Sequence, residues 1–255
     1  VGSEMCKETG SVVRPKKPGY EHGNPHKVFD NKLKQNFTAD EINRKWCTDF
    51  TYLFLANHEV RYNCTIIDLH DRSVIASITD RNITSDLAIR TLRKALESQP
   101  TIKDGLILHS DQGSQYTSKA FTEFCESVNV TQSMSKAGYP YDNAPMERYF
   151  NTLKNECTNL YEFTTEETLY QKVEEFAYVD YNHVRPHSYN GIEPHMKQGR
   201  QHKLISTIFL AQVLQKSLTT TTAGAEASAV MYSIVETAKA NNLNVFQYLY
   251  TVLLY

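Results

Sequence analysis

Three acidic residues stand at positions where packing alone does not explain a charged side chain. Asp49 interrupts the apolar run 48–52 (TDFTY), Asp111 comes directly after an apolar segment, and Glu147 lies near the start of a long predicted helix. Two carboxylates about 4 Å apart repel each other by about 4 kcal/mol at an effective dielectric constant of 20. A divalent cation removes that cost, so we expect the three acids to hold Mg²⁺ or Mn²⁺. Two ions about 3.5–4 Å apart would serve phosphodiester cleavage.

Each acid also has an ordinary structural explanation. An acid at the end of a strand usually forms a turn, and Glu147 at a helix start would complement the helix dipole. Asp68, Asp71 and Asp142 are rival carboxylates, although a turn between predicted strands explains the first two. The combination of three acids, in which 35 residues separate the last two, is more specific than any single acid.

The elements that would position these acids follow a definite order. Aromatic and β-branched runs predict strands, and apolar residues at helical spacing predict helices. Three strands, a helix, a strand, a helix, a strand and then helices indicate a ribonuclease-H-like α/β fold, with a five-stranded mixed sheet flanked by helices. The predicted strands are 46–56, 61–68, 73–79, 105–110 and 130–133, and the predicted helices are 85–98, 118–128, 144–161 and 165–182.

Five motifs resemble the integrase-like catalytic core of insertion-sequence transposases in the IS-three family. They are 46–52 (WCTDFTY), 109–116 (HSDQGSQY), 141–147 (YDNAPME), 153–156 (LKNE) and 181–187 (YNHVRPH). They follow the family order between Phe37 and Pro194, roughly 160 of the 255 residues. The resemblance implies that Asp49, Asp111 and Glu147 are the catalytic, metal-binding triad of a DDE-type transposase. It also implies cleavage and joining of DNA at the inverted-repeat ends of a mobile element, insertion into target DNA, and a homo-oligomer on DNA.

Several polar residues near the acids are candidates for DNA contacts. Lys154 lies two helical turns after Glu147, on the same helix face, and the resemblance implies that it holds donor DNA by a phosphate. Arg148 and Arg185 belong to the same predicted set, and the basic segment 185–203 would add non-specific affinity for DNA.

Two of these candidates have a strong structural alternative. Gln112 and Gly113 would let the backbone approach a phosphate, or they would form an ordinary turn. Asn143 could support the carboxylate one turn later or touch DNA, but a helix N-cap followed by Pro145 is favoured. Trp46 is expected in the core.

Composition permits a DNA partner without demanding one. The net charge is −2, yet residues 13–34 carry six basic residues against two acidic ones. The five cysteines form no Cys-x-x-Cys pair, which indicates free thiols in a reducing cytoplasm. The family resemblance implies a bacterial protein associated with the nucleoid. No signal peptide is visible, and the longest apolar stretch, 204–214, is too short to span a bilayer. Zinc is disfavoured despite four histidines, because no cysteine pair accompanies His183, His187, His195 and His202.

The chain divides into three predicted regions. Residues 1–44 read as an arm left from the region after a helix-turn-helix, 45–200 as the catalytic core, and 201–255 as a helical tail. The segments 224–229 (GAEASA) and 232–241 (YSIVETAKAN) resemble the C-terminal part of IS-sixty-six transposases, which implies a fused second element. Metal-dependent DNA strand cleavage and transfer is the leading function. The alternatives are a ribonuclease-H-like nuclease and a catalytically impaired remnant that only binds DNA.

Overall fold

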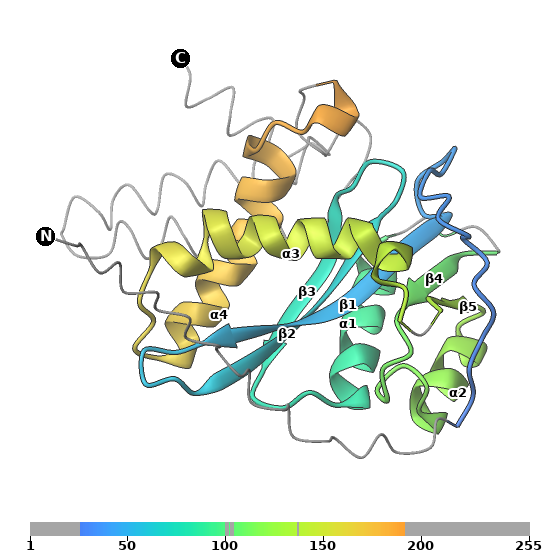
Figure 1. Cartoon of the computed structure of the whole chain (residues 1–255), viewed down its shortest axis with the longest axis horizontal. Coiled ribbons are helices and arrows are strands. Elements are labelled where there is room, and N and C mark those ends of the chain that lie inside the picture. Colours follow the sequence, from blue (N-terminus) through green and yellow to red (C-terminus); the bar gives the residue numbers. More distant parts are fainter. Residues whose placement is uncertain (1–25, 100–101, 103–104, 137, 192–255) are drawn as a thin grey trace, which may run out of the picture.

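One mixed sheet of five strands organises the chain. The computed structural model describes residues 26–99, 102, 105–136 and 138–191, so the predicted tail and the first 25 residues of the arm lie outside it. The strands are β1 (Lys45–Phe54), β2 (Val60–Asp68), β3 (Val74–Asp80), β4 (Ile107–Ser110) and β5 (Thr131–Met134). Their order in the sheet is β3-β2-β1-β4-β5 (Figure 1). β2 pairs antiparallel with both β1 and β3, whereas β4 pairs parallel with both β1 and β5. The predicted α/β fold with a five-stranded mixed sheet is confirmed.

Most of the helices begin and end close to the predicted positions, because their caps are local. The side chains of Thr84, Ser118 and Thr165 accept hydrogen bonds from backbone N–H groups in the first turns of α1 (Ser85–Ser98), α2 (Lys119–Ser127) and α4 (Glu166–Glu175). Glu175 leads directly into a π-helical segment, η3 (Phe176–Val184), and a short 3-10 helix, η4 (Ser188–Asn190), follows.

The helix predicted at 144–161 is shorter than expected. A 3-10 turn, η1 (Pro140–Asn143), leads into α3 (Ala144–Glu156), which ends where Cys157 adopts φ −135° and ψ −77°. A separate 3-10 turn, η2 (Thr158–Leu160), follows. Thr158 and Asn159 are weak helix formers, so nothing local sustains the helix once its buried face ends at Cys157.

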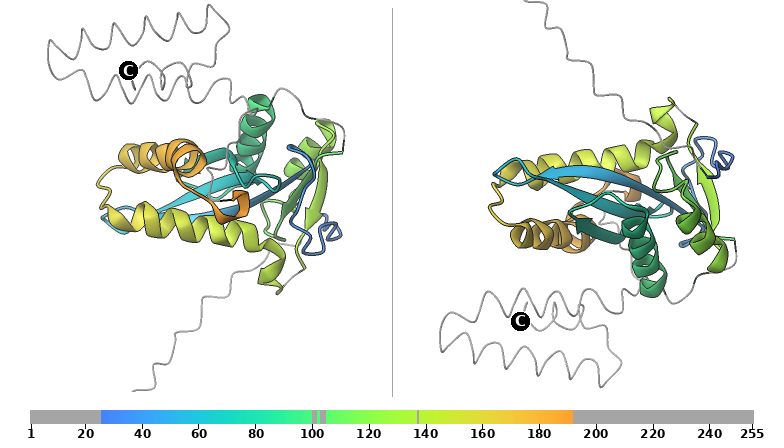
Figure 2. Two further views of the ribbon diagram at one scale, coloured as in Figure 1. Left: turned by 90° about the horizontal axis from the view of Figure 1, so that it is seen from above. Right: turned by 90° about the horizontal axis from the view of Figure 1, so that it is seen from below.

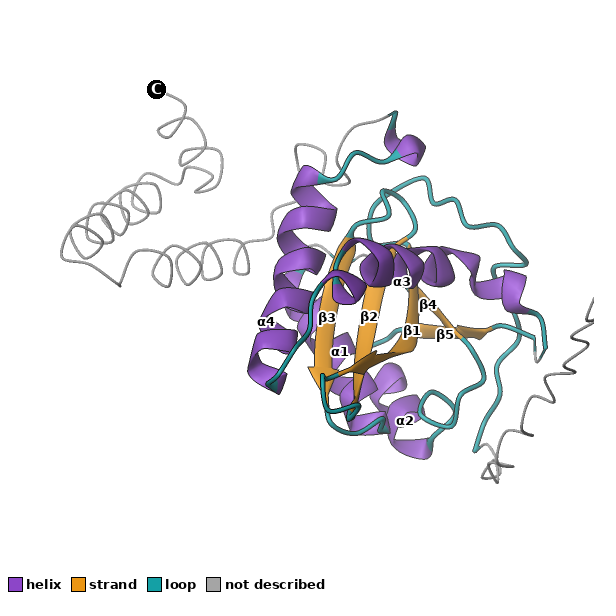
Figure 3. Cartoon of the chain, turned by 60° about the vertical axis from the view of Figure 1, so that its left-hand side comes forward, coloured by secondary structure: helices purple, strands orange, loops and turns teal. Residues whose placement is uncertain are grey.

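Two apolar layers cover the two faces of the sheet. Successive residues of β1 point to opposite faces, so Trp46 packs in the layer with α1 and α2, whereas Cys47 packs in the layer with α3, α4 and η3. Trp46 is fully buried, as expected. Figure 1 shows α3 crossing in front of the strands with α1 behind them, and Figures 2 and 3 show the same layering from other sides. Asp49 shares the face of Cys47, which is the α3 side.

The described part of the predicted arm packs on the core. Leu33 is 2% exposed and joins the apolar layer of α3. The backbone N–H of Lys32 donates to Ser133 Oγ at 2.9 Å. Asn31 Nδ2 and Gln35 Nε2 each donate to the carboxylate of Asp142 at 2.9 Å. Residues 31–35 therefore brace the loop that leads into α3.

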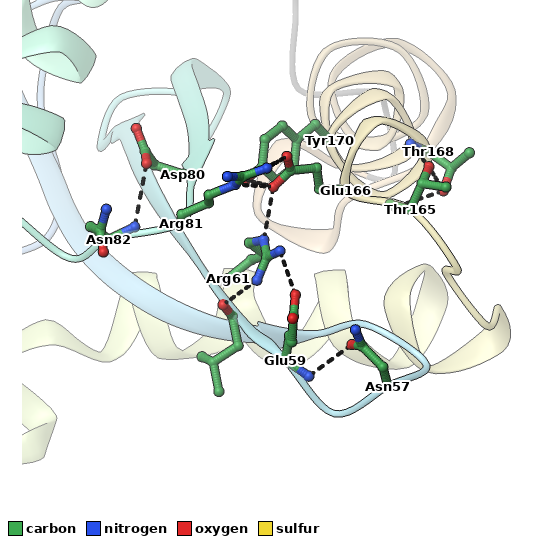
Figure 4. Close-up of polar contacts among 11 residues, drawn as sticks. Asn57, Glu59, Arg61, Asp80, Arg81, Asn82, Thr165, Glu166, Thr168 and Tyr170 are labelled. Atoms are coloured by element: carbon green, nitrogen blue, oxygen red, sulfur yellow. Dashed lines mark hydrogen bonds and ion pairs between the residues drawn. The ribbon is translucent and has the colours of Figure 1, made fainter.

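An ion-pair network fastens the first turn of α4 to β2 and to the end of β3. Glu166 accepts hydrogen bonds from Arg61 on β2 and from Arg81, which follows β3 (Figure 4). The hydrogen bond from Arg81 is the main reason that the pKa of Glu166 falls to about 2. Glu59 extends the network through Arg61 at 2.8 Å.

Candidate active site

Asp49 and Asp111 lie on neighbouring parallel strands. β1 pairs with β4 in a register that sets Cys47 beside His109. Continuing that register by two residues sets Asp49 beside Asp111, just beyond the end of β4. Parallel strands lie about 4.8 Å apart. The two carboxylates therefore belong to one site at the C-terminal end of β4, on the face of the sheet that α3 covers.

Burial and repulsion both act on Asp49. Burial is the main reason that its pKa rises to about 7, and the negative charges of Asp111 and Glu147 raise the pKa further. Hydrogen bonds from the Phe50 N–H, at 2.7 Å, and from Asn143 Nδ2, at 3.1 Å, oppose that rise in the pKa. The action of both other predicted acids on Asp49 is the pattern expected of a site that a cation would complete.

Asp111 is set by the loop that follows β4. Burial raises the pKa of Asp111, and the Gly113 N–H lowers it by donating to Oδ1 at 2.9 Å. A Cβ on Gly113 would lie 2.9 Å from that same Oδ1. The glycine is therefore needed for the close approach of backbone to carboxylate.

Glu147 enters from the first turn of α3 and is exposed. Within the described parts of the chain, no group of three or more His, Cys, Asp or Glu side chains is preassembled around a metal position. The donor chemistry nevertheless suits a hard cation, because Asp49, Asp111 and Glu147 offer carboxylate oxygens of the kind that Mg²⁺ and Mn²⁺ prefer.

The predicted N-cap position of Asn143, with Pro145 in the first turn, is confirmed, but the side chain of Asn143 does not cap α3. Asn143 occupies the N-cap position but accepts no hydrogen bond from the first turn of the helix. Its amide nitrogen turns instead to Asp49, while its Oδ1 is buried without a hydrogen-bond partner in the described structure. The preceding 3-10 turn explains the difference, since it brings Asn143 against β1. Asn143 thus supports a carboxylate, but on β1 rather than on its own helix.

The other predicted DNA-contacting residues are spread over α3 and its surroundings. Gln112 is exposed, and its Nε2 donates to the Ser135 carbonyl at 3.0 Å, as in an ordinary loop contact. Arg148 is exposed in the first turn of α3, and Lys154 is partly buried in the last. Arg185 forms a two-point ion pair with Glu156, with both distances 2.7 Å.

The rival carboxylates have structural partners. Asp68 accepts hydrogen bonds from the backbone of Asn43 and His70, and Asp71 accepts from the backbone and hydroxyl of Ser73. The turn interpretation of Asp68 and Asp71 is therefore confirmed. Asp142 accepts hydrogen bonds from Gln35, from the Lys136 N–H and from Asn31, which hold its pKa below the usual range.

His109 is a structural part of the site that the sequence interpretation left without a role. Its ring lies fully buried two residues before Asp111. Nδ1 contacts Ser133 Oγ at 2.9 Å, and Nε2 contacts the Asp142 carbonyl at 2.9 Å. Burial lowers the pKa of His109, so the ring stays neutral. A polar residue inside the apolar strand 105–110 was the available signal.

Other sequence expectations concern cysteine, histidine and membranes. Cys47, Cys64, Cys125 and Cys157 are buried free thiols. The pKa of His183 is lowered by burial, while His195 and His202 lie outside the described residues. No helix in the described part of the chain is both long and apolar enough to cross a bilayer.

Comparisons with known proteins agree with this geometry. Two family models, each described as an integrase core domain, match residues 39–140 and 128–194. Transposase InsF for insertion sequence IS3A from Escherichia coli strain K12 is 36% identical over 170 residues, which is 67% of this chain and 58% of InsF. The insertion element IS600 uncharacterized 31 kDa protein of Shigella sonnei is 33% identical over 178 residues, 69% of this chain and 65% of that protein. The chain thus spans less than two thirds of the length of either relative.

A solved structure shares the fold. A chain in the simian T-cell lymphotropic virus intasome, in complex with PP2A regulatory subunit B56 gamma, superposes with a TM-score of 0.54 at 16% identity. The match covers 72% of this chain and 62% of the other. At that identity, the likeness supports the ribonuclease-H-like fold and nothing finer.

Proposed function

We propose that this chain, which belongs to the integrase-core transposases of the IS3 family, cleaves DNA strands and joins them to new DNA using divalent metal ions held by Asp49, Asp111 and Glu147. The observation that carries the proposal is the β1–β4 register, which, when continued by two residues, sets Asp49 beside Asp111. The pKa of Asp49 agrees with it, since burial raises this pKa to about 7 and the charges of Asp111 and Glu147 add to the rise. The charges of Asp111, just after β4, and of Glu147, on α3, both act on Asp49, although Glu147 lies 98 positions after Asp49 in the sequence.

The ions supply charge neutralisation at the scissile phosphate and an acidified water when bound. The protein's own residues prepare their place. Asp49 has two hydrogen bonds that favour its ionised form, from the Phe50 N–H and from Asn143. The Gly113 N–H does the same for Asp111. A pKa near 7 means that Asp49 releases a proton on binding a cation at neutral pH. Mg²⁺ or Mn²⁺, as two ions, is the proposed cofactor.

The proposed DNA contacts surround the acids. Lys154 lies on the same face of α3 as Glu147, so a phosphate backbone along that face would meet it, and Arg148 lies beside that face in the first turn. Gln112 and Asn143 are proposed to contact the same DNA strand. Arg185 reaches DNA only by leaving Glu156, so we expect its contribution to be smaller.

The proposed partners are the inverted-repeat ends of an insertion sequence and its target DNA, bound by a homo-oligomer at the bacterial nucleoid. The proposed domain arrangement is an arm at 1–44, a core at 45–200 and a tail at 201–255. The described residues 26–191 already hold two extensive apolar layers on the two faces of the sheet, which supports a core with its own hydrophobic interior. Deletion of residues 204–255 should therefore spare core activity and core thermal stability.

Strand transfer by the full chain tests the function. A labelled duplex carrying the terminal repeat that flanks the gene would be incubated with unlabelled target DNA and Mg²⁺ or Mn²⁺. We expect joined products with the wild type, none with Asp111→Asn, and wild-type yield with the matched control Asp40→Asn, an exposed acid before β1. Joining by Asp111→Asn would refute the metal role. Cleavage without joining would favour a nuclease, and DNA binding without either reaction would favour a non-catalytic remnant.

A further inference from the structure

A pocket adjoins α3 beside the candidate active site. It has a volume of about 370 Å³ and lies between the first turn of α3, the turn that joins β2 to β3, and the segment after η3. Its polar walls include Arg72, Arg148, His187 and Tyr189. The residues that line it include no Asp or Glu, so the pocket is electropositive and polar on one side.

Arg72 is the best-placed cation of this pocket. It sits in the β2–β3 turn with φ 66°, a left-handed conformation that a non-glycine residue adopts at a cost. Its Nη2 donates to the Phe37 carbonyl at 2.8 Å, and its guanidinium lies 4.4 Å from the ring centre of Tyr189. Its Nη1 is buried without a hydrogen-bond partner in the described structure. A buried, unpaired cationic donor is costly, and an anionic oxygen would offset that cost.

Two further groups show that the positive charges converge. Burial lowers the pKa of His187, and the charges of Arg185, Arg148 and Arg72 lower it further. Burial raises the pKa of Tyr181 to about 12, and the same three arginines oppose the rise. His187 therefore stays neutral, and its Nδ1 accepts the Tyr189 N–H at 3.2 Å. That acceptor role places the ring proton on Nε2, which makes His187 a donor.

The pocket lies beside the proposed path of DNA. Arg148 directly follows Glu147, and Ala144 and Pro145, which also line the pocket, precede it. The acids and the pocket thus occupy adjacent sides of one helical turn, and a helix with its side chains is about 10–12 Å across. The positive end of the α3 dipole adds to the field.

We infer that this pocket binds a phosphate group of a DNA strand whose reacting phosphate lies at the three acids. The inference rests on the proposed function, which it deepens with a second, metal-independent phosphate contact made by Arg72 and Arg148. Arg72 is a new assignment, because it lies in a β-turn far in sequence from every predicted DNA contact. The ring of Tyr189, over which the Arg72 guanidinium lies, helps to hold that guanidinium in place.

Binding measurements without metal separate this inference from catalysis. The full chain in EDTA would be titrated with a fluorescent single strand and with its duplex, as wild type, Arg72→Gln and Arg148→Gln. The matched control is Arg93→Gln, an arginine that stacks on Phe124 at 5.3 Å on the opposite layer. We expect each pocket variant to raise the Kd about 5-fold to 10-fold and to reduce the salt slope by about 1. The control should bind like the wild type.

Inorganic phosphate tests the pocket itself. Phosphate at millimolar concentration should raise the melting temperature of the wild type and of Arg93→Gln, and should not raise that of Arg72→Gln. Arg148→Gln changes an exposed side chain, so it keeps the test valid if Arg72→Gln folds poorly.

The inference is overturned if Arg148→Gln binds DNA within 2-fold of the wild type. It is equally overturned if phosphate stabilises the protein while both pocket variants bind DNA normally, since the site would then serve free phosphate. If the wild type fails to transfer strands but the pocket variants still weaken DNA binding, only the proposed function would be refuted.

Discussion

The side-chain amide of Asn143 donates a hydrogen bond of 3.1 Å to the carboxylate of Asp49. The bond joins the residue before α3 to the middle of β1, and so ties the helix that carries Glu147 to the strand that carries the first acid. The position of α3 relative to the sheet thereby modulates the pKa of Asp49, which burial mainly determines, and affects the distance between the acids.

Replacing Asn143 should shift the pH dependence of the reaction. The hydrogen bond from Asn143 lowers the pKa of Asp49, so Asn143→Ala should raise that pKa and move the rising limb of the pH–rate profile to higher pH. Loss of an outer-shell partner typically costs about 10-fold to 100-fold in metal affinity or activity. Rates across pH at saturating and limiting Mg²⁺ would measure both effects. Asn151→Ala, an exposed change on the same helix, is the control, and an unshifted profile for Asn143→Ala would contradict the role.

Neutralising Asp49 should stabilise the metal-free protein in a pH-dependent way. The folded-state pKa of about 7 lies above the ordinary value of 3.8, so the folded state binds more protons than the unfolded state between these values. Stability therefore falls as pH rises from about 4 to 7. Asp49→Asn removes that loss. The free energy of unfolding of the variant should exceed that of the wild type by on the order of 1–3 kcal/mol at pH 8, and the two should be equal at pH 4. Urea unfolding in EDTA, with Asp40→Asn as control, measures the difference. Equal gains at both pH values would argue against the buried-charge explanation.

Adding a methyl group at Gly113 should damage metal binding more than folding. The new Cβ would lie 2.9 Å from Asp111 Oδ1, and the carboxylate must move away from the Gly113 N–H. We expect Gly113→Ala to weaken Mn²⁺ binding by about 10-fold or more, with thermal stability nearly unchanged because the loop is partly exposed. Calorimetric titration with Mn²⁺ provides the affinity. Ser114→Ala, the exposed neighbour, serves as control, and wild-type affinity in Gly113→Ala would show that Asp111 tolerates the shift.

Removing the charge of Glu166 should change stability in acid. The pKa of Glu166 is lowered to about 2 from the ordinary 4.5, chiefly by Arg81 and then by Arg61. A lowered folded-state pKa contributes stability above pH 4.5, and that contribution disappears as pH falls toward 2. Glu166→Gln should therefore lower the melting temperature at pH 7 and flatten its decline between pH 5 and 2. Glu167→Gln, on the same turn but exposed, should retain the wild-type curve; a wild-type curve for Glu166→Gln would show that the network is too exposed to matter.

Local signals determined most of what the sequence could reveal. Periodicity and capping residues placed the strands and helices to within a few residues, because both depend on near neighbours in the chain. The apolar run around Asp49 and the strand before Asp111 marked those acids as exceptions that needed a reason. Asp68 and Asp71 were separated from them correctly, because a turn is also a local structure.

Tertiary structure decided which partner each polar side chain takes. Asn143 has the sequence of an N-cap, but the 3-10 turn before α3 presses it against β1, and it binds Asp49 instead. Arg185 is basic in sequence but paired with Glu156 in space, and Arg72 becomes part of a pocket only because η4 packs over its turn. Hydrogen bonds and ion pairs join whichever groups the fold brings within about 3 Å. Such distances depend on the packing of helices against the sheet, which no local pattern of residues encodes.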